Sequence, residues 1–304
     1  MPIKKVIHLA DIHIRTYRMH SEYKESFITL FDEITKAIEG YQRDEVRIII
    51  VGDLVHQKII ISNEQLILGT WFLRKLEAIA PVVIIAGNHD LLENNKDRMD
   101  SISPMVQFLP NENINFFKES KCYLDDNIVW CVYSIFEENK TPNIESARLE
   151  FGDDKTYIGL FHAPLINAKT DIGYEFDHGA GLDIFEGCDM VMLGDIHKRQ
   201  IFIHKQTMEV DKENLERYIK IGWVVDDDKN SAKINIKKVI PICYSGSLIQ
   251  QDFGENVTKH GFLMWDIETK TFTEYDIENK YSLYQFKIKS LDDLDANAEK
   301  ITNL

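Results

Sequence analysis

Residues 81–90 read PVVIIAGNHD, and the interpretation of the whole chain starts from this stretch. An apolar run that breaks into a polar, glycine-containing turn predicts a short buried β-strand followed by a loop. The loop carries Asn88, His89 and Asp90 at the carboxyl end of the strand, where open α/β sheets keep their ligand sites. An amide oxygen, an imidazole and a carboxylate in succession offer a metal ligand, a proton carrier and a group that orients the carrier.

Other apolar runs, two earlier and two later in the chain, end in the same kind of polar turn. Taken singly, an Asp after a strand is usually a turn or helix-cap residue, and a lone His is usually a hydrogen-bonded polar side chain. Five strand-to-loop junctions that all end in metal-binding residue types are improbable as turn chemistry alone. The candidate ligands at these junctions are Asp11, His13, Asp53, Asn88, His162, Asp195 and His197.

All of these side chains are oxygen or imidazole donors, which suit manganese, iron or zinc and disfavour a thiolate site. They outnumber the coordination positions of a single ion, so the sequence predicts two divalent metal ions. A carboxylate shared by both ions would hold them at roughly 3.5–4 Å, the spacing of two-metal phosphoesterases. Asp53 is the candidate for this shared ligand.

Helical patterns alternate with apolar strands in the first half of the chain, and strands dominate afterwards. A helix is expected from Ser21 to Gly40, a second from a Ser62–Gln65 capping box to Ala80, and a short one at 101–109 that Pro110 closes. A β-hairpin is expected at 261–277. This order indicates an α/β (α+β layered) fold, a two-sheet β-sandwich flanked by helices.

Residues 204–238 differ from their surroundings and predict an inserted helix and hairpin. Asp211 is the expected cap of a helix that runs to Lys220 and stops at Gly222, and a charged turn follows at 226–229. The segment lies between two stretches of core strand pattern.

The net charge of −15 argues against a protein that binds nucleic acid through a global basic field. It leaves a local site open, because bound divalent cations reverse the sign of the charge where a phosphate must sit. No apolar stretch approaches the roughly 18 residues that span a bilayer, and the start of the chain lacks a signal-peptide hydrophobic region. The scattered cysteines favour neither a disulfide framework nor a thiolate zinc site. We therefore expect a cytoplasmic protein with no membrane partner.

The order of the motifs resembles the calcineurin-like metallophosphoesterase superfamily. The motifs are Asp-x-His, Gly-Asp-x-x-His, Gly-Asn-His-Asp, a lone His and Gly-x-x-His. The later stretch Tyr244-Ser245-Gly246-Ser247, followed by Asp252-Phe253-Gly254-Glu255 and Gly261-Phe262, is most similar to the SbcD/Mre nucleases of double-strand-break repair. The similarity covers about residues 3–268, apart from the insertion.

The resemblance implies a division of the candidate ligands between two manganese ions. One metal would be held by Asp11, His13, Asp53 and His197, and the other by Asp53, Asn88, His162 and Asp195. His89 would be the acid that protonates the departing sugar oxygen, with Asp90 orienting it. His56 would lie near the phosphate.

The function that follows from this resemblance is a metal-dependent DNA exonuclease or endonuclease that works with an SbcC-type ATPase. Residues 1–279 would form the nuclease domain, and 280–304 the start of a DNA-capping domain, apparently truncated. A homodimer is expected through the helices at 62–80 and 101–109, because these carry surplus apolar side chains. The alternatives are a metallophosphatase or small-molecule phosphodiesterase of the same superfamily, or a mainly structural nuclease-like subunit.

Several residues depart from the pattern or stand outside it. The family usually has His where this chain has Asp195, and Pro where it has Ser245. Basic residues that flank the site loops are candidates for contacts with DNA phosphates: Arg15, Arg18, Lys198 and Arg199. The remaining histidines are expected to be surface residues (His20, His178, His204 and His260) or structural (His8).

Overall fold

The structure is a computed structural model that describes residues 1–58, 60–92, 94–107, 109, 113–220, 223–227, 233–286 and 288–302. The helix ends expected at Pro110 and Gly222, and residues 228–229 of the expected charged turn, lie outside these ranges.

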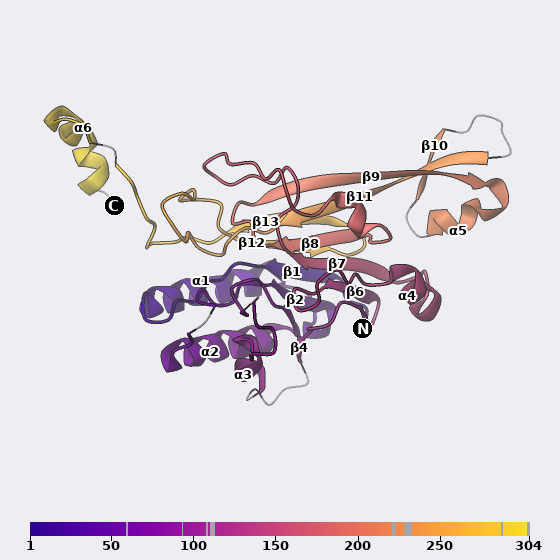
Figure 1. The fold of residues 1–304 in the computed structure, drawn as a ribbon, viewed down its shortest axis with the longest axis horizontal. Coiled ribbons are helices and arrows are strands. Elements are labelled where there is room, and N and C mark those ends of the chain that lie inside the picture. The colour runs from indigo at the N-terminus through magenta and orange to yellow at the C-terminus, as the bar shows by residue number, and fades with distance from the viewer. Residues whose placement is uncertain are drawn as a thin grey trace.

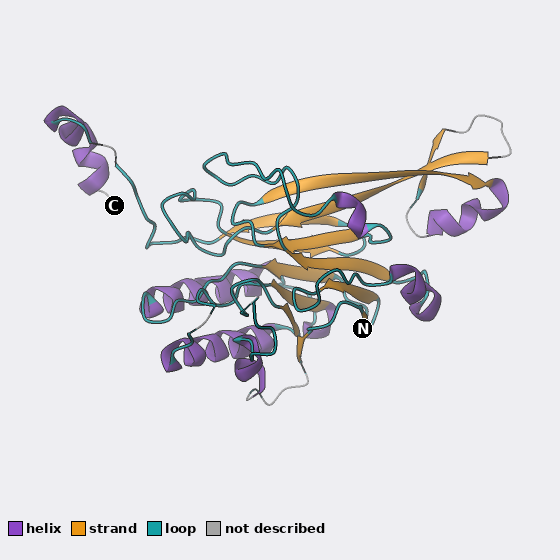
Figure 2. Ribbon diagram, in the orientation of Figure 1, coloured by secondary structure: helices purple, strands orange, loops and turns teal. Residues whose placement is uncertain are grey.

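Two β-sheets stack face to face and form the body of the molecule (Figures 1 and 2). The first sheet has the strand order β13-β12-β1-β2-β3-β4. In it β1 to β4 run parallel, while at one edge β12 pairs antiparallel with β1, and β13 pairs antiparallel with β12. Its strands are β1 (Lys5–Leu9), β2 (Val46–Val51), β3 (Val82–Ile85), β4 (Ile114–Phe116), β12 (Gly261–Asp266) and β13 (Thr271–Asp276).

The second sheet has the order β10-β11-β8-β7-β6-β5, and β9 pairs with β11 outside this path. Its central strands β6, β7, β8 and β11 are parallel. The strands are β5 (Cys122–Asp125), β6 (Ile128–Tyr133), β7 (Thr156–His162), β8 (Met190–Gly194), β9 (Gln200–Asp211), β10 (Val224–Asp227) and β11 (Lys233–Tyr244).

Apolar runs produce the central strands, because both of their faces are covered. Every residue of β3 and of β6 is buried, which is typical of parallel strands enclosed between layers. The space between the sheets is filled by aliphatic side chains and by Trp130 and Trp265, both fully buried.

Helices cover the outer face of the first sheet (Figure 2). They are α1 (His20–Ala37), α2 (Asn63–Ile79) and α3 (Ile102–Gln107). Phe27 of α1 packs against Phe72 of α2 with a ring separation of 4.3 Å. The Ser62 hydroxyl caps α2 by accepting from Gln65 N, as predicted, but the Gln65 side chain donates to Ile14 O rather than closing a capping box.

The smaller elements lie around this sandwich. They are α4 (Ile144–Phe151), α5 (Leu215–Lys220), α6 (Leu291–Thr302) and the 3-10 turns Arg43–Glu45, Leu182–Phe185 and Lys212–Asn214. Within the described residues, no helix is both long and apolar enough to span a membrane. The predicted α/β sandwich flanked by helices is confirmed.

A long β-arm replaces part of the insertion that the sequence predicted. β9 and β11 pair over their whole length, and the arm carries α5 and β10 at its far end (Figure 1). Residues 204–211 therefore continue a core strand, and the helix expected from Asp211 begins as a 3-10 turn before α5. A separate small cluster of Val210, Ile234 and Ile236 supports the arm.

Candidate metal centre

The candidate ligands lie at the carboxyl ends of β1, β2, β3, β7 and β8, at one edge of the sandwich: His162 is the last residue of β7, and the others lie on the loops that follow their strands. Backbone hydrogen bonds tie these loops together: Asp11 N donates to Gly52 O, and His13 N donates to Asp53 O. Four of the ligand candidates adopt the left-handed backbone region, with φ of 53° at Asp11, 52° at His13, 56° at Asp53 and 93° at Asp195. Such conformations are unfavourable for residues with a Cβ and gather at functional sites.

The fold brings the candidates from both sheets into one compact group. The ligand atoms of Asp11, His13 and His197 lie within 4.8 Å of one another, and so do those of Asp11, Asp53 and His162. The two Nε2 atoms of His13 and His197 are 2.9 Å apart. Imidazole and carboxylate groups this close together form the donor set of a divalent transition-metal site.

Asp53 lies between the two groups. Its Oδ2 is 3.4 Å from His13 Nε2, whereas its Oδ1 is 3.3 Å from His162 Nε2. Each carboxylate oxygen thus faces a different imidazole, which is the arrangement of a carboxylate that can bridge two ions.

Hydrogen bonds fix which nitrogen of each imidazole is available. His162 Nδ1 lies 2.7 Å from Val51 O, and because a carbonyl only accepts, Nδ1 carries the proton. His197 Nδ1 lies 2.6 Å from Glu255 Oε1 and donates in the same way. In both rings Nε2 is the nitrogen that faces the group of carboxylates, so it is the atom that a metal ion could take in place of a proton.

Six buried side-chain polar atoms of the described residues lack a hydrogen-bond partner, and two of them, Asn88 Oδ1 and His162 Nε2, belong to ligand candidates. Buried donors and acceptors are almost always paired, so such atoms indicate a ligand. The position of Gly87 supports this, because a Cβ there would collide with Asp53 Oδ1 and His162 Nε2. The residues present therefore fit a metal centre.

The buried carboxylates of the site also favour the binding of cations. Within the described part of the chain, the ion pairs of Asp11, Asp53 and Asp195 involve only histidines. Burial raises the pKa of Asp11 to about 7 and raises that of Asp195 as well. Burial would raise the pKa of Asp53 too, but the His162 and His13 imidazoles outweigh it and hold that pKa below its ordinary value. Divalent ions would stabilise the ionised carboxylates.

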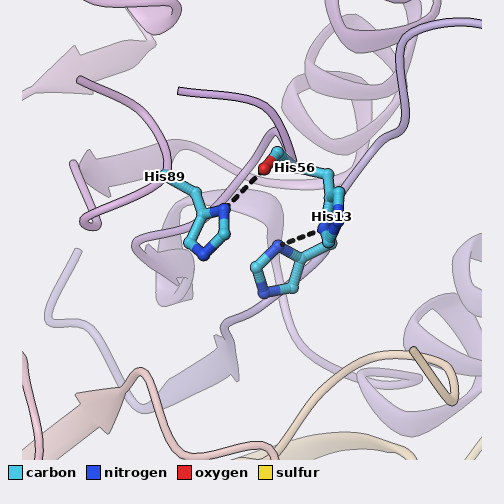
Figure 3. Close-up of side chains that lie close together, drawn as sticks. All are labelled: His13, His56 and His89. Atoms are coloured by element: carbon cyan, nitrogen blue, oxygen red, sulfur yellow. Dashed lines mark hydrogen bonds between the residues drawn. The ribbon is translucent and has the colours of Figure 1, made fainter. Parts of the chain in front are cut away.

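A second set of imidazoles, His13, His56 and His89, adjoins the metal centre (Figure 3). His89 Nδ1 donates to His56 O at 2.5 Å, and His89 N donates to Asp53 Oδ1 at 2.8 Å. His56 Nε2 faces the Arg15 guanidinium at 3.2 Å, and burial followed by the Arg15 charge lowers the pKa of His56 to about 4. His89 and His56 thus lie together beside the ligand candidates, with a fixed cation next to them.

Asp90 has a different environment from the one expected. Its carboxylate accepts hydrogen bonds from the backbone amides of Leu54, Val55 and Gly87. His89 Nδ1 donates to the backbone carbonyl of His56 and not to Asp90. The expectation that Asp90 orients the His89 ring directly is therefore corrected. Asp90 joins the loop after β2 to the loop after β3.

Glu255 is a site residue that the strand-end pattern did not identify. It contacts His197 although it lies on a separate loop 58 residues later. His260, expected at the surface, is buried with 3% exposure and lies 3.0 Å from Ser247 Oγ. The resemblance singled out the stretches around both residues, but residue spacing alone could not show where they lie in space.

Two of the basic residues expected to contact DNA differ in their surroundings. The expectation for Arg199 is wrong, because its side chain is 6% exposed and forms ion pairs with Glu274 and Asp276. Lys198 instead lines a cavity of about 220 Å³ that Asp195 and His197 also border. This cavity offers space for a substrate directly beside the ligand candidates.

Comparison with known proteins agrees with the fold and the donor set. The chain matches the calcineurin-like phosphoesterase family over residues 4–199. It is also 32% identical over 292 residues to "Uncharacterized protein R555" of Acanthamoeba polyphaga mimivirus, a match that covers 94% of this chain and 19% of that protein. The chain thus spans about a fifth of the length of that relative. It belongs to the calcineurin-like phosphoesterase family, whose members bind divalent metals and cleave phosphoesters.

Proposed function

We propose that this phosphoesterase is a DNA nuclease similar to the SbcD/Mre enzymes, with manganese as its metal. The observation that carries the proposal is the contact of Glu255 with His197. Glu255 belongs to the stretch after Tyr244 on which the resemblance to these nucleases rests, and it lies beyond the residues 4–199 matched by the wider family. The stretch on which this resemblance rests thus contacts the metal centre, and this supports the proposal.

The ligand candidates would hold two ions as the resemblance divides them, with Asp53 shared. Bound divalent ions supply Lewis-acid chemistry, polarising the phosphodiester and lowering the pKa of the attacking water. His89 donates Nδ1–H to a backbone carbonyl, so its ring is held in one orientation beside the centre. A proton carried on its Nε2 would pass to the departing sugar oxygen.

The substrate's negative charge would meet a cation beside the two histidines. Arg15 donates to Gln251 O at 2.9 Å and faces His56, so its guanidinium is anchored at the edge of the site. Arginine recognises phosphate oxygens well because its donors form a planar fork. The proposed role of Arg15 and His56 is to hold a backbone phosphate next to the metal centre.

The test compares substrates of different classes under one set of conditions. Purified protein with Mn²⁺ is incubated with linear duplex DNA, single-stranded DNA, bis-p-nitrophenyl phosphate and a phosphopeptide. We expect DNA cleavage that EDTA abolishes and that Asp53→Asn removes. Asp32→Asn is the matched control, because Asp32 is an exposed residue of α1 away from the site.

The outcomes separate the proposal from its alternatives. Hydrolysis of the phosphopeptide or the small diester without DNA cleavage would overturn the nuclease assignment in favour of another phosphoesterase. Mn²⁺ binding without hydrolysis of any substrate would favour a mainly structural subunit that assembles with an SbcC-type ATPase.

A further inference from the structure

Glu255 accepts a hydrogen bond from Nδ1 of His197, the ring nitrogen that faces away from the other ligand candidates. Its Oε1 accepts from His197 Nδ1 at 2.6 Å, while His197 Nε2 faces His13 Nε2 and Asp11 Oδ1. The Glu255 side chain is 8% exposed and that of His197 is 27% exposed, so the carboxylate is largely shielded from water. A hydrogen bond to an ionised acceptor is short and strong in such surroundings.

Glu255 is itself fixed by neighbouring groups. Its Oε2 accepts from Ser247 Oγ and from Gln251 N, both at 3.0 Å. Ser247 Oγ in turn lies 3.0 Å from Nδ1 of the buried His260, whose Nε2 donates to Asn256 O at 2.6 Å. Both oxygens of the carboxylate are therefore hydrogen-bonded, which holds the side chain in this orientation.

The same loop is attached to the wall of the cavity beside the site. Asn256, next to Glu255 in sequence, hydrogen-bonds Asp171 through its backbone N and its side-chain Nδ2, at 3.1 and 2.7 Å. Asp171 and Glu255 both line the cavity that Asp195 and His197 border. The loop that carries Glu255 is thus held at the site from two directions.

We propose that Glu255 is a positioning residue for metal binding, with Ser247 and His260 as its supports. The carboxylate sets the His197 tautomer, orients the ring and makes Nε2 a stronger donor. Metal-bound histidines commonly have such a carboxylate on their other nitrogen, and its loss typically weakens metal affinity about 10–100-fold. The proposal rests on the two-metal reading of the proposed function, and it concerns the ion that His197 would hold.

The experiment measures Mn²⁺ binding to the whole protein by isothermal titration calorimetry, without any substrate. We expect two binding events in the wild type. Glu255→Gln should weaken one of them about 10–100-fold and leave the other unchanged. The substitution keeps the size of the side chain and one accepting oxygen, but the amide nitrogen that replaces the other oxygen cannot accept a hydrogen bond. A small fall in the melting temperature of the metal-free protein is therefore compatible with the positioning role, and the readout is the selective weakening of one binding event.

Two further variants serve as a control and as a milder form of the same change. Glu274→Gln makes the same chemical change at a carboxylate that is 56% exposed and should bind both ions as the wild type does. Ser247→Ala removes one support of Glu255 and should weaken the same event as Glu255→Gln, by a smaller factor.

Each remaining outcome contradicts the positioning role. Wild-type affinities for both ions in Glu255→Gln would overturn it, and so would equal weakening of both events together with a lower melting temperature. Failure of the nuclease proposal has a different signature. In that case Mn²⁺ binding would respond to Glu255→Gln as described, while the wild type would leave DNA intact.

Discussion

Asp53 is the residue on which the proposed centre depends most, because its two oxygens face different imidazoles. We expect Asp53→Asn to lose both metal ions and all hydrolytic activity, since an amide neither bridges two cations nor balances their charge. Metal content measured on the purified variant, together with a cleavage assay, tests this. Normal metal content with normal cleavage would show that the two-metal assignment is wrong.

His89 should behave in the opposite way. Its imidazole adjoins the centre but is held by His56 O rather than by a carboxylate. We expect His89→Gln to retain its metal ions and to cleave DNA at least about 10²-fold more slowly, the usual effect of losing general-acid help. Metal content of the purified variant and a DNA-cleavage assay test this, as for Asp53. A variant that also loses its metal would identify His89 as a ligand.

Asp195 stands at a position where the resemblance led us to expect a histidine. Its Oδ1 is 3.8 Å from His162 Nε2, and its side chain is 18% exposed. Compared with an imidazole, a carboxylate adds a negative charge that attracts divalent ions but leaves them weaker Lewis acids. Asp195→His should therefore weaken Mn²⁺ binding and shift the pH–rate profile toward acid. An unchanged affinity and profile would show that Asp195 does not contact the metal.

The strand-end pattern predicted which residues gather at the site, because parallel strands deliver their carboxyl ends to one edge. It did not predict the partners that arrive from elsewhere in the chain. Glu255 contacts His197 only through the folding of a later loop. Asp90 accepts hydrogen bonds from three backbone amides. Its position next to His89 in the sequence could not predict these partners.

Helix α2 has an apolar residue that the chain itself does not cover. Ile67 is 69% exposed, whereas Trp71 is half-buried and packs against the Phe31 ring at 5.6 Å. The proposed homodimer therefore depends on Ile67 rather than on both residues. We expect Ile67→Glu to give a soluble monomer that still unfolds cooperatively, measured by light scattering and thermal unfolding.

Trp71→Glu is the contrasting variant for this helix. It should unfold at a lower temperature, because it removes an aromatic contact within the chain. A wild-type protein that is already monomeric, or an Ile67→Glu variant that stays dimeric, would contradict the dimer through α2.

Elements with strong periodicity were predicted well, and those that depend on pairing were not. Helices α1 and α2 and the β12–β13 hairpin follow their patterns closely. Strand β9 alternates between half-buried and exposed residues along most of its length, so its sequence carries little apolar signal. Its pairing with β11 defines it as a strand. The short helix α4 was missed for a similar reason, since only two of its residues are buried.

At the scale of the whole molecule, an ionic cluster joins the two sheets at the edge opposite the metal centre. Asp189, just before β8, accepts from Lys238 of β11 at 2.8 Å and from Lys270 of the β12–β13 turn at 3.0 Å. Asp189 and Lys238 are 4% and 3% exposed. Arg148 of α4 lies 3.5 Å from the other carboxylate oxygen. Elements of both sheets thus meet on one carboxylate.

We expect Asp189→Asn to destabilise the protein by about 3–5 kcal/mol, because it leaves Lys238 buried without a counter-charge. The free energy of unfolding in denaturant at pH 7 measures the effect. The double variant Asp189→Asn with Lys238→Met should recover part of the loss, since it removes the unpaired charge as well. Equal stability of Asp189→Asn and wild type would show that the cluster contributes nothing.

The pH dependence gives an independent check on the same carboxylate. Burial alone would raise the pKa of Asp189, but Lys238, Lys270 and Arg148 outweigh it and hold the pKa below its ordinary 3.8. A carboxyl whose pKa is lower in the folded state binds its proton more tightly when the chain unfolds. Its stabilisation is therefore complete well above pH 3.8 and disappears as the pH falls through the lower folded-state value. The stability difference between wild type and Asp189→Asn should accordingly stay constant near neutral pH and shrink in acid. A difference that instead grew on acidification would show that burial, not the three cations, determines the pKa of Asp189.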